Sequence, residues 1–168
     1  MKTVYISLGS NLGDRAANIG QAIDAMAKRG INVAKRSSLY ETEPVNAKGG
    51  WFLNCVAEVE TDMMPRQLLR ALLQIEESLG RKRGVAAGKK PGEPSEARAI
   101  DIDILLFGTS MMRYPELEIP HPRMADRRFV LVPFAEIAPD MAHPALHKTI
   151  AELLEATSDR GQVRPFRG

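Results

Sequence analysis

The sequence has little of several residue types, and each shortage excludes a class of protein. Its one cysteine, Cys55, cannot form an internal disulfide or a multi-cysteine metal site, and it fits a reducing compartment. The formal net charge is only +2, without the strong basic excess of a nucleic-acid-binding domain. No apolar run reaches the roughly 20 residues that cross a bilayer. Disulfide-rich, polyanion-binding and membrane-spanning proteins are therefore excluded.

The length and the first residues predict one cytoplasmic domain. A chain of 168 residues buries roughly 70% of its unfolded surface, which is enough for one core. Residues Met1 to Tyr5 lead directly into a strand-like pattern and lack the apolar segment and cleavage site of a signal peptide. We expect a single domain over residues 1–168, without a membrane or nucleic-acid partner. Nothing in the sequence demands an oligomer, so we expect a monomer.

Residue periodicity predicts the order strand, helix, strand, strand, helix, strand, followed by a mostly helical tail. The expected strands cover residues 3–8, 32–41, 52–60 and 99–107, and the expected helices cover 14–29 and 65–79. In the tail, a short apolar helix lies near 129–137, and Thr149 and Glu152 match the capping box of a last helix. This order predicts an α+β fold, a ferredoxin-like βαββαβ sandwich with a C-terminal mostly helical extension.

Residues 81–98 form the most irregular stretch, RKRGVAAGKKPGEPSEAR. Three glycines and two prolines lie among six basic and two acidic residues. Such a polar stretch cannot bury itself, so we expect a mobile surface loop over about 81–98.

Two aspartates on the last predicted strand give the strongest chemical signal. Asp101 and Asp103 alternate with isoleucines, so both carboxylates point to one face, roughly 7 Å apart at their α-carbons. Carboxylates at this spacing can bridge one Mg²⁺ or a pair of Mg²⁺ ions in phosphoryl chemistry, and oxygen ligands favour Mg²⁺ over Zn²⁺. Arg98 could hold phosphates beside the metal. The alternative is a solvated face whose carboxylates only keep the sheet soluble.

Other candidate residues indicate little by themselves. Arg81 and Arg83 follow a predicted helix, where cations are stabilised by the helix dipole. His121, between two prolines, is by itself typical of a surface histidine. The glycines after the first strand match neither the dinucleotide-binding nor the P-loop pattern.

Six short motifs follow one another along the chain. They are Gly9-Ser10-Asn11-Leu12, Tyr40-Glu41-Thr42-Glu43-Pro44-Val45, Phe52-Leu53-Asn54, Ile75-Glu76-Glu77-Ser78-Leu79-Gly80-Arg81, Arg98-Ala99-Ile100-Asp101-Ile102-Asp103 and Pro120-His121-Pro122-Arg123-Met124. Their order and approximate spacing, from Val4 to about Pro139, resemble the 6-hydroxymethyl-7,8-dihydropterin pyrophosphokinase family of folate biosynthesis. The resemblance implies a ferredoxin-like fold and transfer of the pyrophosphoryl group of ATP to the pterin's hydroxymethyl oxygen, releasing AMP.

The resemblance also implies roles for individual residues. Asp101 and Asp103 would hold two Mg²⁺ ions, and Arg81, Arg98 and His121 would be the catalytic residues. The ATP site would contain Glu76, Arg83, Arg98, Ile104, His121 and Arg127. The pterin slot would be formed by Thr42, Glu43, Val45, Phe52, Asn54 and Phe129. An asparagine offers both a donor and an acceptor to a heterocycle edge, and a phenylalanine offers a face for stacking.

The chain departs from the family pattern just before Arg98. Many members carry Trp-Gly-Pro-Arg there, whereas this sequence has Ser95-Glu96-Ala97-Arg98. Its single tryptophan, Trp51, lies next to the pterin motif instead.

Three other functions stay open on the sequence. A ferredoxin-like RNA-binding module needs exposed aromatics on its central strands, and the first strand offers only Tyr5. A small-molecule-sensing domain would leave the aspartate pair without a role. A different Mg²⁺-dependent nucleotide transferase would use the same pair for another acceptor.

Overall fold

An antiparallel sheet forms the centre of the computed structural model, which describes residues 1–44, 50–80 and 99–167. The strands lie in the order β5-β1-β4-β3-β8, and β2 also pairs with β4. Their bounds are β1 Lys2–Ser10, β2 Asn32–Arg36, β3 Tyr40–Thr42, β4 Phe52–Thr61, β5 Asp101–Phe107 and β8 Val163–Pro165. Each neighbouring pair is antiparallel. The predicted α+β class is confirmed at this level.

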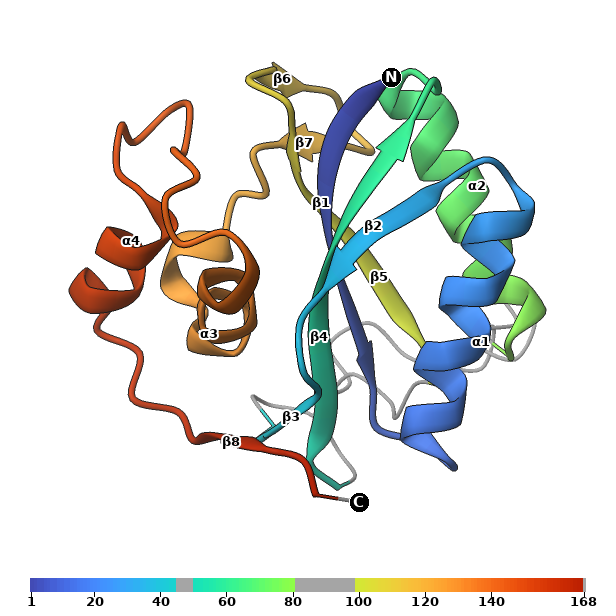
Figure 1. Ribbon diagram of the computed structural model, residues 1–168, viewed down its shortest axis with the longest axis horizontal. Helices are drawn as coiled ribbons and strands as arrows, with labels where there is room; N and C mark the ends of the chain where they lie inside the picture. Colours follow the sequence, from blue (N-terminus) through green and yellow to red (C-terminus); the bar gives the residue numbers. More distant parts are fainter. Residues whose placement is uncertain (45–49, 81–98, 168) are drawn as a thin grey trace.

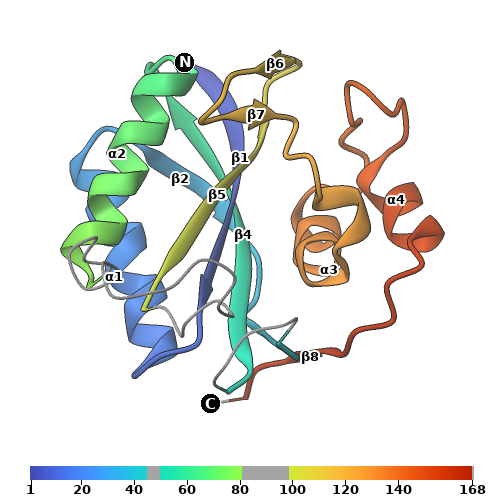
Figure 2. The same cartoon turned by 180° about the vertical axis from the view of Figure 1, so that it is seen from behind.

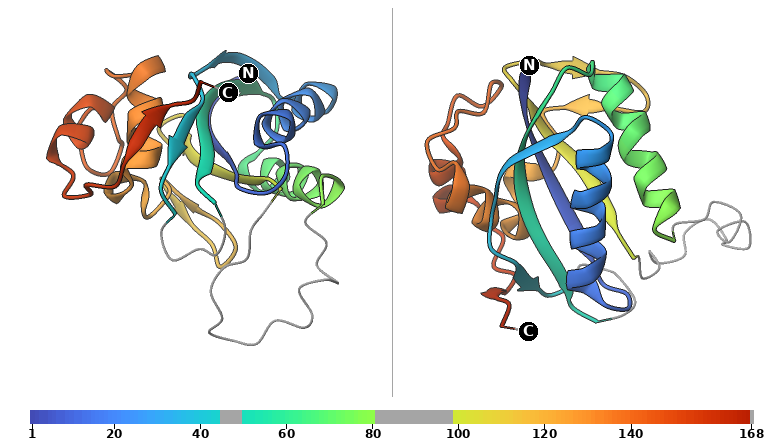
Figure 3. Two further views of the ribbon diagram at one scale, coloured as in Figure 1. Left: turned by 90° about the horizontal axis from the view of Figure 1, so that it is seen from below. Right: turned by 45° about the vertical axis from the view of Figure 1, so that its right-hand side comes forward.

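Helices cover both faces of the sheet (Figures 1 and 2). Helices α1 (Arg15–Lys28) and α2 (Pro65–Ser78) lie side by side on one face, as Figure 3 also shows. Helices α3 (Arg128–Ile137) and α4 (Ile150–Ala156) lie on the other. Between β5 and α3 come the β6–β7 hairpin (Met112–Arg113 and Glu118–Ile119) and the short 3₁₀ helix η2 (Met124–Asp126). In the described residues, no helix is long and apolar enough to cross a membrane.

The helix ends follow the sequence signals. The side chain of Asp14 accepts a hydrogen bond from the Ala17 N–H at the start of α1, and Pro65 occupies the first turn of α2. Gly30 and Gly80, just beyond the two helices, have φ of +80° and +120°, a region that favours glycine. The predicted capping box of α4 is also present. These ends are therefore determined locally.

Two apolar clusters lie on opposite faces of the sheet. The larger one, against α1 and α2, includes Ile6, Leu8 and Ile102. The smaller one, against α3 and α4, includes Tyr5 and Phe134, whose ring centroids are 4.8 Å apart. Cys55 is fully buried in the larger cluster, as predicted.

A bulge in β5 distributes the apolar residues of this strand between the two clusters. Ile104 pairs with Ile6 and Leu106 pairs with Tyr5, so Leu105 is an extra residue between them. As a result, Leu105 and Leu106 both join the smaller cluster, while Ile104 and Phe107 remain in the larger one. The bulge therefore lets one strand contribute to both cores.

Two predictions about elements are wrong. The single strand expected over 32–41 is divided into β2 and β3, because the Oγ of Ser37 accepts from the Val56 N–H at 3.0 Å in place of a backbone carbonyl. The tail is less helical than expected, since it contains the β6–β7 hairpin and β8. The expected loop over 81–98 lies outside the described residues.

Candidate functional site

The sheet register brings predicted site residues from separate strands into one row. Asp101 of β5 lies opposite Gly9 of β1, and Gly9 lies opposite Asn54 of β4. Directly opposed residues in antiparallel strands share a face. Asp103, opposite Ser7, follows on the same face. Asp101 and Asn54 are therefore two strands apart, about 10 Å at their α-carbons, on the face that carries α3 and α4.

The aspartates are placed as the alternation predicted. Asp101 and Asp103 are half-buried, whereas Ile102 and Ile104 are 6% and 4% exposed in the larger core. Within the described ranges, no group of three or more His, Cys, Asp or Glu side chains is arranged for a metal. A carboxylate pair suits a cation that takes its other ligands from water and phosphate, as Mg²⁺ does.

Glu76 supports the strand that carries the aspartates. This residue of α2 is 2% exposed, and its Oε2 accepts from the Ile102 N–H at 2.7 Å. Because β5 lies at one end of the strand order, this bond holds an outward backbone amide that no strand of the described residues pairs. The carboxylate thereby fixes the backbone between Asp101 and Asp103.

His121 lies in the loop that follows β7 and bonds back to β5. The backbone N–H of His121 donates to the Leu105 carbonyl at 2.9 Å. The Nδ1 of its imidazole accepts from the backbone N–H of Arg123 at 3.1 Å. Burial lowers the pKa of His121 to about 4; the charges of Arg127 and Arg123 add to this shift, and Asp101 opposes it. The imidazole is therefore neutral at pH 7, with its proton on Nε2.

Arg127 and Phe129 lie at the start of α3. Arg127 occupies the N-cap position, and its guanidinium carbon is 5.5 Å from the centroid of the Phe129 ring. Phe129 also borders a cavity of about 350 Å³, together with Glu43 and Pro44. Thus α3 brings a cation and an aromatic ring to the end of the sheet that carries Asp101 and Asn54.

A buried pair of polar side chains links β3 to β4. The Nδ2 of Asn54 donates to the Oγ1 of Thr42 at 2.6 Å, and the two residues are 9% and 2% exposed. A Cβ on Gly9 would lie 2.5 Å from the Oδ1 of Asn54. A side chain at Gly9 would therefore displace the Asn54 amide. Sequence reasoning missed this constraint because it read Gly9 only as part of a turn.

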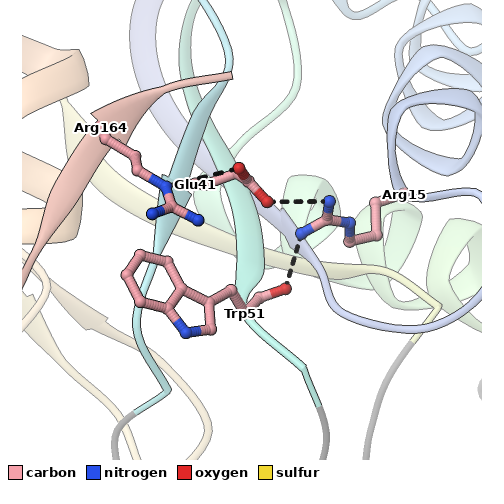
Figure 4. A network of polar contacts seen from close by, with 4 residues as sticks. All are labelled: Arg15, Glu41, Trp51 and Arg164. Atoms are coloured by element: carbon pink, nitrogen blue, oxygen red, sulfur yellow. Dashed lines mark hydrogen bonds and ion pairs between the residues drawn. The ribbon is translucent and has the colours of Figure 1, made fainter. Parts of the chain in front are cut away.

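A network of charged side chains surrounds the start of β4 (Figure 4). Arg15 donates to the Trp51 carbonyl at 2.8 Å and to Glu41 at 3.0 Å. Arg164 of β8 reaches the other oxygen of Glu41 at 3.5 Å, and its guanidinium carbon lies 4.2 Å from the Trp51 ring centroid. Sequence reasoning missed this network, because its members come from four separate segments.

Not every predicted site residue meets the others. Phe52 lies opposite Thr42 in the sheet, close to Gly9, and joins the row. The side chain of Ile104 points into the larger core instead. Arg81, Arg83, Arg98 and Val45 lie outside the described residues.

Comparison with known proteins decides the family. Residues 5–139 match the model of the family described as 7,8-dihydro-6-hydroxymethylpterin-pyrophosphokinase (HPPK). The chain belongs to the HPPK family. The match contains all the predicted site residues, including the two aspartates and Asn54.

Named relatives and a solved structure agree with the HPPK assignment. The chain is 43% identical over 135 residues to a 2-amino-4-hydroxy-6-hydroxymethyldihydropteridine pyrophosphokinase from Bacillus subtilis, covering 79% of this chain and 76% of the relative. A protein of the same name from Aquifex aeolicus is 36% identical, covering 99% and 96%. Plasmodium falciparum HPPK-DHPS has a TM-score of 0.72 at 16% identity, covering 92% of this chain and 45% of that chain, and shows the fold.

Some relatives are much longer than this chain. The folic acid synthesis protein fol1 of Pneumocystis carinii is 42% identical over 168 residues, which cover 98% of this chain but 22% of the relative. The chain thus spans about a fifth of the length of such curated relatives.

Proposed function

We propose that this chain transfers the pyrophosphoryl group of ATP to the hydroxymethyl oxygen of 6-hydroxymethyl-7,8-dihydropterin in folate biosynthesis, and releases AMP. A bond forms between that oxygen and the β-phosphorus, and the bond from the β-phosphorus to the oxygen that bridges it to the α-phosphorus breaks. AMP leaves with the bridging oxygen, and the hydroxyl proton passes to solvent. The observation that carries the proposal is the row Asp101, Gly9 and Asn54. It sets a carboxylate pair suited to phosphate-bound cations about 10 Å from an amide suited to a heterocycle.

Asp101 and Asp103 are the proposed ligands of two Mg²⁺ ions. Their half-buried carboxylates fit an ion that keeps several water and phosphate ligands. Such ions, when bound, neutralise phosphate charge and polarise the attacking hydroxyl. Glu76 keeps the two carboxylates in place through its hydrogen bond with the Ile102 amide. In this way Glu76 would support ATP binding without itself contacting the nucleotide.

His121 and Arg127 are the proposed partners of the phosphate oxygens among the described residues. His121 is neutral, with Nε2–H available as a donor, and Arg127 lies close enough to lower its pKa. A bound triphosphate would raise the pKa of His121 again, because its negative charge favours a proton on the imidazole. Arg81, Arg83 and Arg98 remain predicted contributors to the same charge. Ile104 is also predicted at the ATP site, but its side chain packs in the larger core, so we do not propose that this side chain contacts ATP.

The proposed pterin slot lies between β3, β4 and α3. One hydrogen of the Asn54 amide is committed to Thr42, which leaves its other hydrogen and Oδ1 for the edge of the ring. The ring of Phe129 would stack on the pterin face, and Glu43 borders the same cavity. Phe52 and Val45 complete the prediction. Positioning the reactants accounts for most of the catalysis expected of such a site.

We also propose that the fold is ferredoxin-like. The support is the element order β1, α1, β2, β4, α2, β5 together with the strand order β5-β1-β4-β2, which is a split βαβ arrangement. A single domain over 1–168, a cytoplasmic location and a monomeric state remain predictions.

An RNA-binding module is disfavoured by Tyr5. Its ring is 6% exposed, packs on Phe134 and donates its hydroxyl to Glu58 at 2.7 Å. A base-stacking aromatic would have to be exposed.

One assay tests the function. The full chain is incubated with ATP, Mg²⁺ and the hydroxymethyl-dihydropterin, and the nucleotide product is identified. AMP formed in equal amount to pyrophosphorylated pterin supports the proposal. ADP would indicate an ordinary kinase, and pterin-dependent turnover that persists in excess EDTA would contradict the Mg²⁺ sites. No turnover would favour a binding or sensing domain.

A further inference from the structure

The segment from Asp159 to Phe166 returns to the site after α4. It lies beyond the 5–139 match to the family. Its strand β8 pairs with β3, with Arg164 opposite Glu41 and Val163 opposite Thr42. The Phe166 N–H also donates to the Leu39 carbonyl at 2.9 Å. A segment outside the family match therefore forms the edge of the sheet beside the proposed pterin residues.

One end of this segment is fastened to helix α3. The Oδ2 of Asp159 accepts from the backbone N–H of Arg128 at 2.8 Å. The guanidinium of Arg128 donates to the Gly161 carbonyl at 3.0 Å. The Oδ1 of Asp159 accepts from the Gly161 N–H at 2.8 Å. Asp159 thus binds the first residue of α3, which directly precedes Phe129.

The other end is fastened to the chain that follows β3. The Gln162 N–H donates to Oε1 of Glu43 at 2.8 Å, and the Glu43 N–H donates to the Gln162 carbonyl at 3.3 Å. Glu43 directly follows Thr42, the hydrogen-bond partner of Asn54. The same few residues therefore contact both sides of the proposed slot.

The cavity between these sides is lined by the segment itself. Its volume is about 350 Å³, within the range of small-molecule pockets. The lining residues are Glu43, Pro44 and Phe129 together with Asp159, Gly161, Gln162 and Val163. Most of this lining comes from outside the family match.

We infer that residues 159–163 form a third wall of the pterin slot and that Asp159 is a positioning residue, an inference that rests on the proposed function. Asp159 fixes the start of α3 and hence the Phe129 ring, while Gln162 fixes Glu43. Together they set the separation between the stacking ring and the polar edge of the slot. Asp159 reaches the substrate only through these neighbours.

The test compares Asp159→Asn with wild type and with Ser158→Ala, a change at an exposed neighbouring residue. An asparagine can still accept from the Gly161 N–H, but its amide nitrogen cannot accept from the Arg128 N–H. We expect KM for the pterin to rise about tenfold, with kcat and KM for ATP within about twofold of wild type. The Kd of the pterin alone should rise by the same factor. Asp159→Glu, which keeps a carboxylate, should recover part of the affinity, and Ser158→Ala should match wild type.

The outcomes separate this inference from the proposed function. If the wild-type protein makes no AMP, the proposed function is refuted, independently of any result with the Asp159 variants. If wild type makes AMP and Asp159→Asn lowers only Tm, or changes both KM values equally, the inference is overturned. Should Asp159→Asn not fold, Arg128→Gln breaks the contact with Gly161 from the other side. An unchanged pterin KM in that variant would overturn the inference as well.

Discussion

The two faces of the central sheet carry different chemistry on the same strands. The face toward α1 and α2 is apolar along its length, with Ile6, Leu8 and Ile102 in one continuous core. The face toward α3 and α4 is apolar around Tyr5 but polar at the other end, where Asp101 and Asn54 lie in register with Gly9. Because side chains alternate along a strand, each buried isoleucine on one face fixes the backbone of a polar residue on the other.

This comparison indicates that the two faces have different roles. Substitutions on the apolar face should act on stability, and substitutions on the polar end of the other face should act on substrates. Neighbouring residues of a single strand offer the cleanest contrast, since their backbones move together.

The largest effect is expected for Asp103→Asn on the polar face. The change keeps the side-chain shape and removes one carboxylate of the proposed metal pair, so turnover should fall roughly a thousandfold. The free energy of unfolding should change by less than about 1 kcal/mol. Steady-state AMP release and thermal melting measure the two effects, and Asp24→Asn, at an exposed carboxylate of α1, is the control. Full Mg²⁺-dependent activity in Asp103→Asn would refute the metal assignment.

Next in size is Ile104→Ala, at the residue beside Asp103. Its side chain is 4% exposed in the larger core, so truncation should cost about 2–5 kcal/mol of unfolding free energy. Below the melting transition, KM for ATP should stay within about twofold of wild type. Urea denaturation and initial rates measure these quantities. A rise in KM for ATP without loss of stability would instead assign the side chain itself to the nucleotide.

A smaller effect is expected for Gly9→Ala, compared with Gly20→Ala on α1. The new Cβ at Gly9 would lie 2.5 Å from Oδ1 of Asn54, whereas nothing lies within 4 Å of one at Gly20. Displacing the Asn54 amide should raise KM for the pterin about tenfold. Gly20→Ala should raise stability by about 0.5–1 kcal/mol and leave the kinetics unchanged. Equal pterin affinity in both variants would show that Asn54 tolerates the displacement.

The smallest effect concerns pH. The pKa of His121 falls from its ordinary value of 6.5 to about 4, chiefly through burial. Between these pH values the unfolded chain binds more protons than the folded one, so stability declines as pH falls through this window. In His121→Gln, Tm should therefore drop less between pH 7 and pH 5 than in wild type. Burial also lowers the pKa of His143, so only part of the dependence should vanish. If Tm changed with pH equally in His121→Gln and in wild type, His121 would have to lie in a more solvated environment.

Much of the fold and part of the site could be predicted because their signals are local. The helical periodicity over α2, the capping box at Thr149, and the alternation of aspartate with isoleucine in β5 each depend on residues a few positions apart. Periodicity and capping chemistry describe such segments well.

The rest depends on contacts between distant segments. Strand β8 has three residues, one of them Pro165, and its partners in β3 lie more than 120 positions earlier, so no local pattern indicates it. The clearance at Gly9 depends on Asn54 in the adjacent strand. The low pKa of His121 arises from burial and from the surrounding charges. Each of these requires the tertiary structure.

The bond from Glu76 to the Ile102 amide also bears on self-association. An edge strand with unpaired amides is a template on which a second sheet can add, and proteins protect such edges with charge or cover. Here a buried carboxylate occupies an outward amide of β5, at the same point where the two aspartates need a rigid backbone. Replacing Glu76 would therefore disturb the aspartates and free an outward amide of the strand at once, so one side chain contributes both to the geometry of the site and to the protection of this edge.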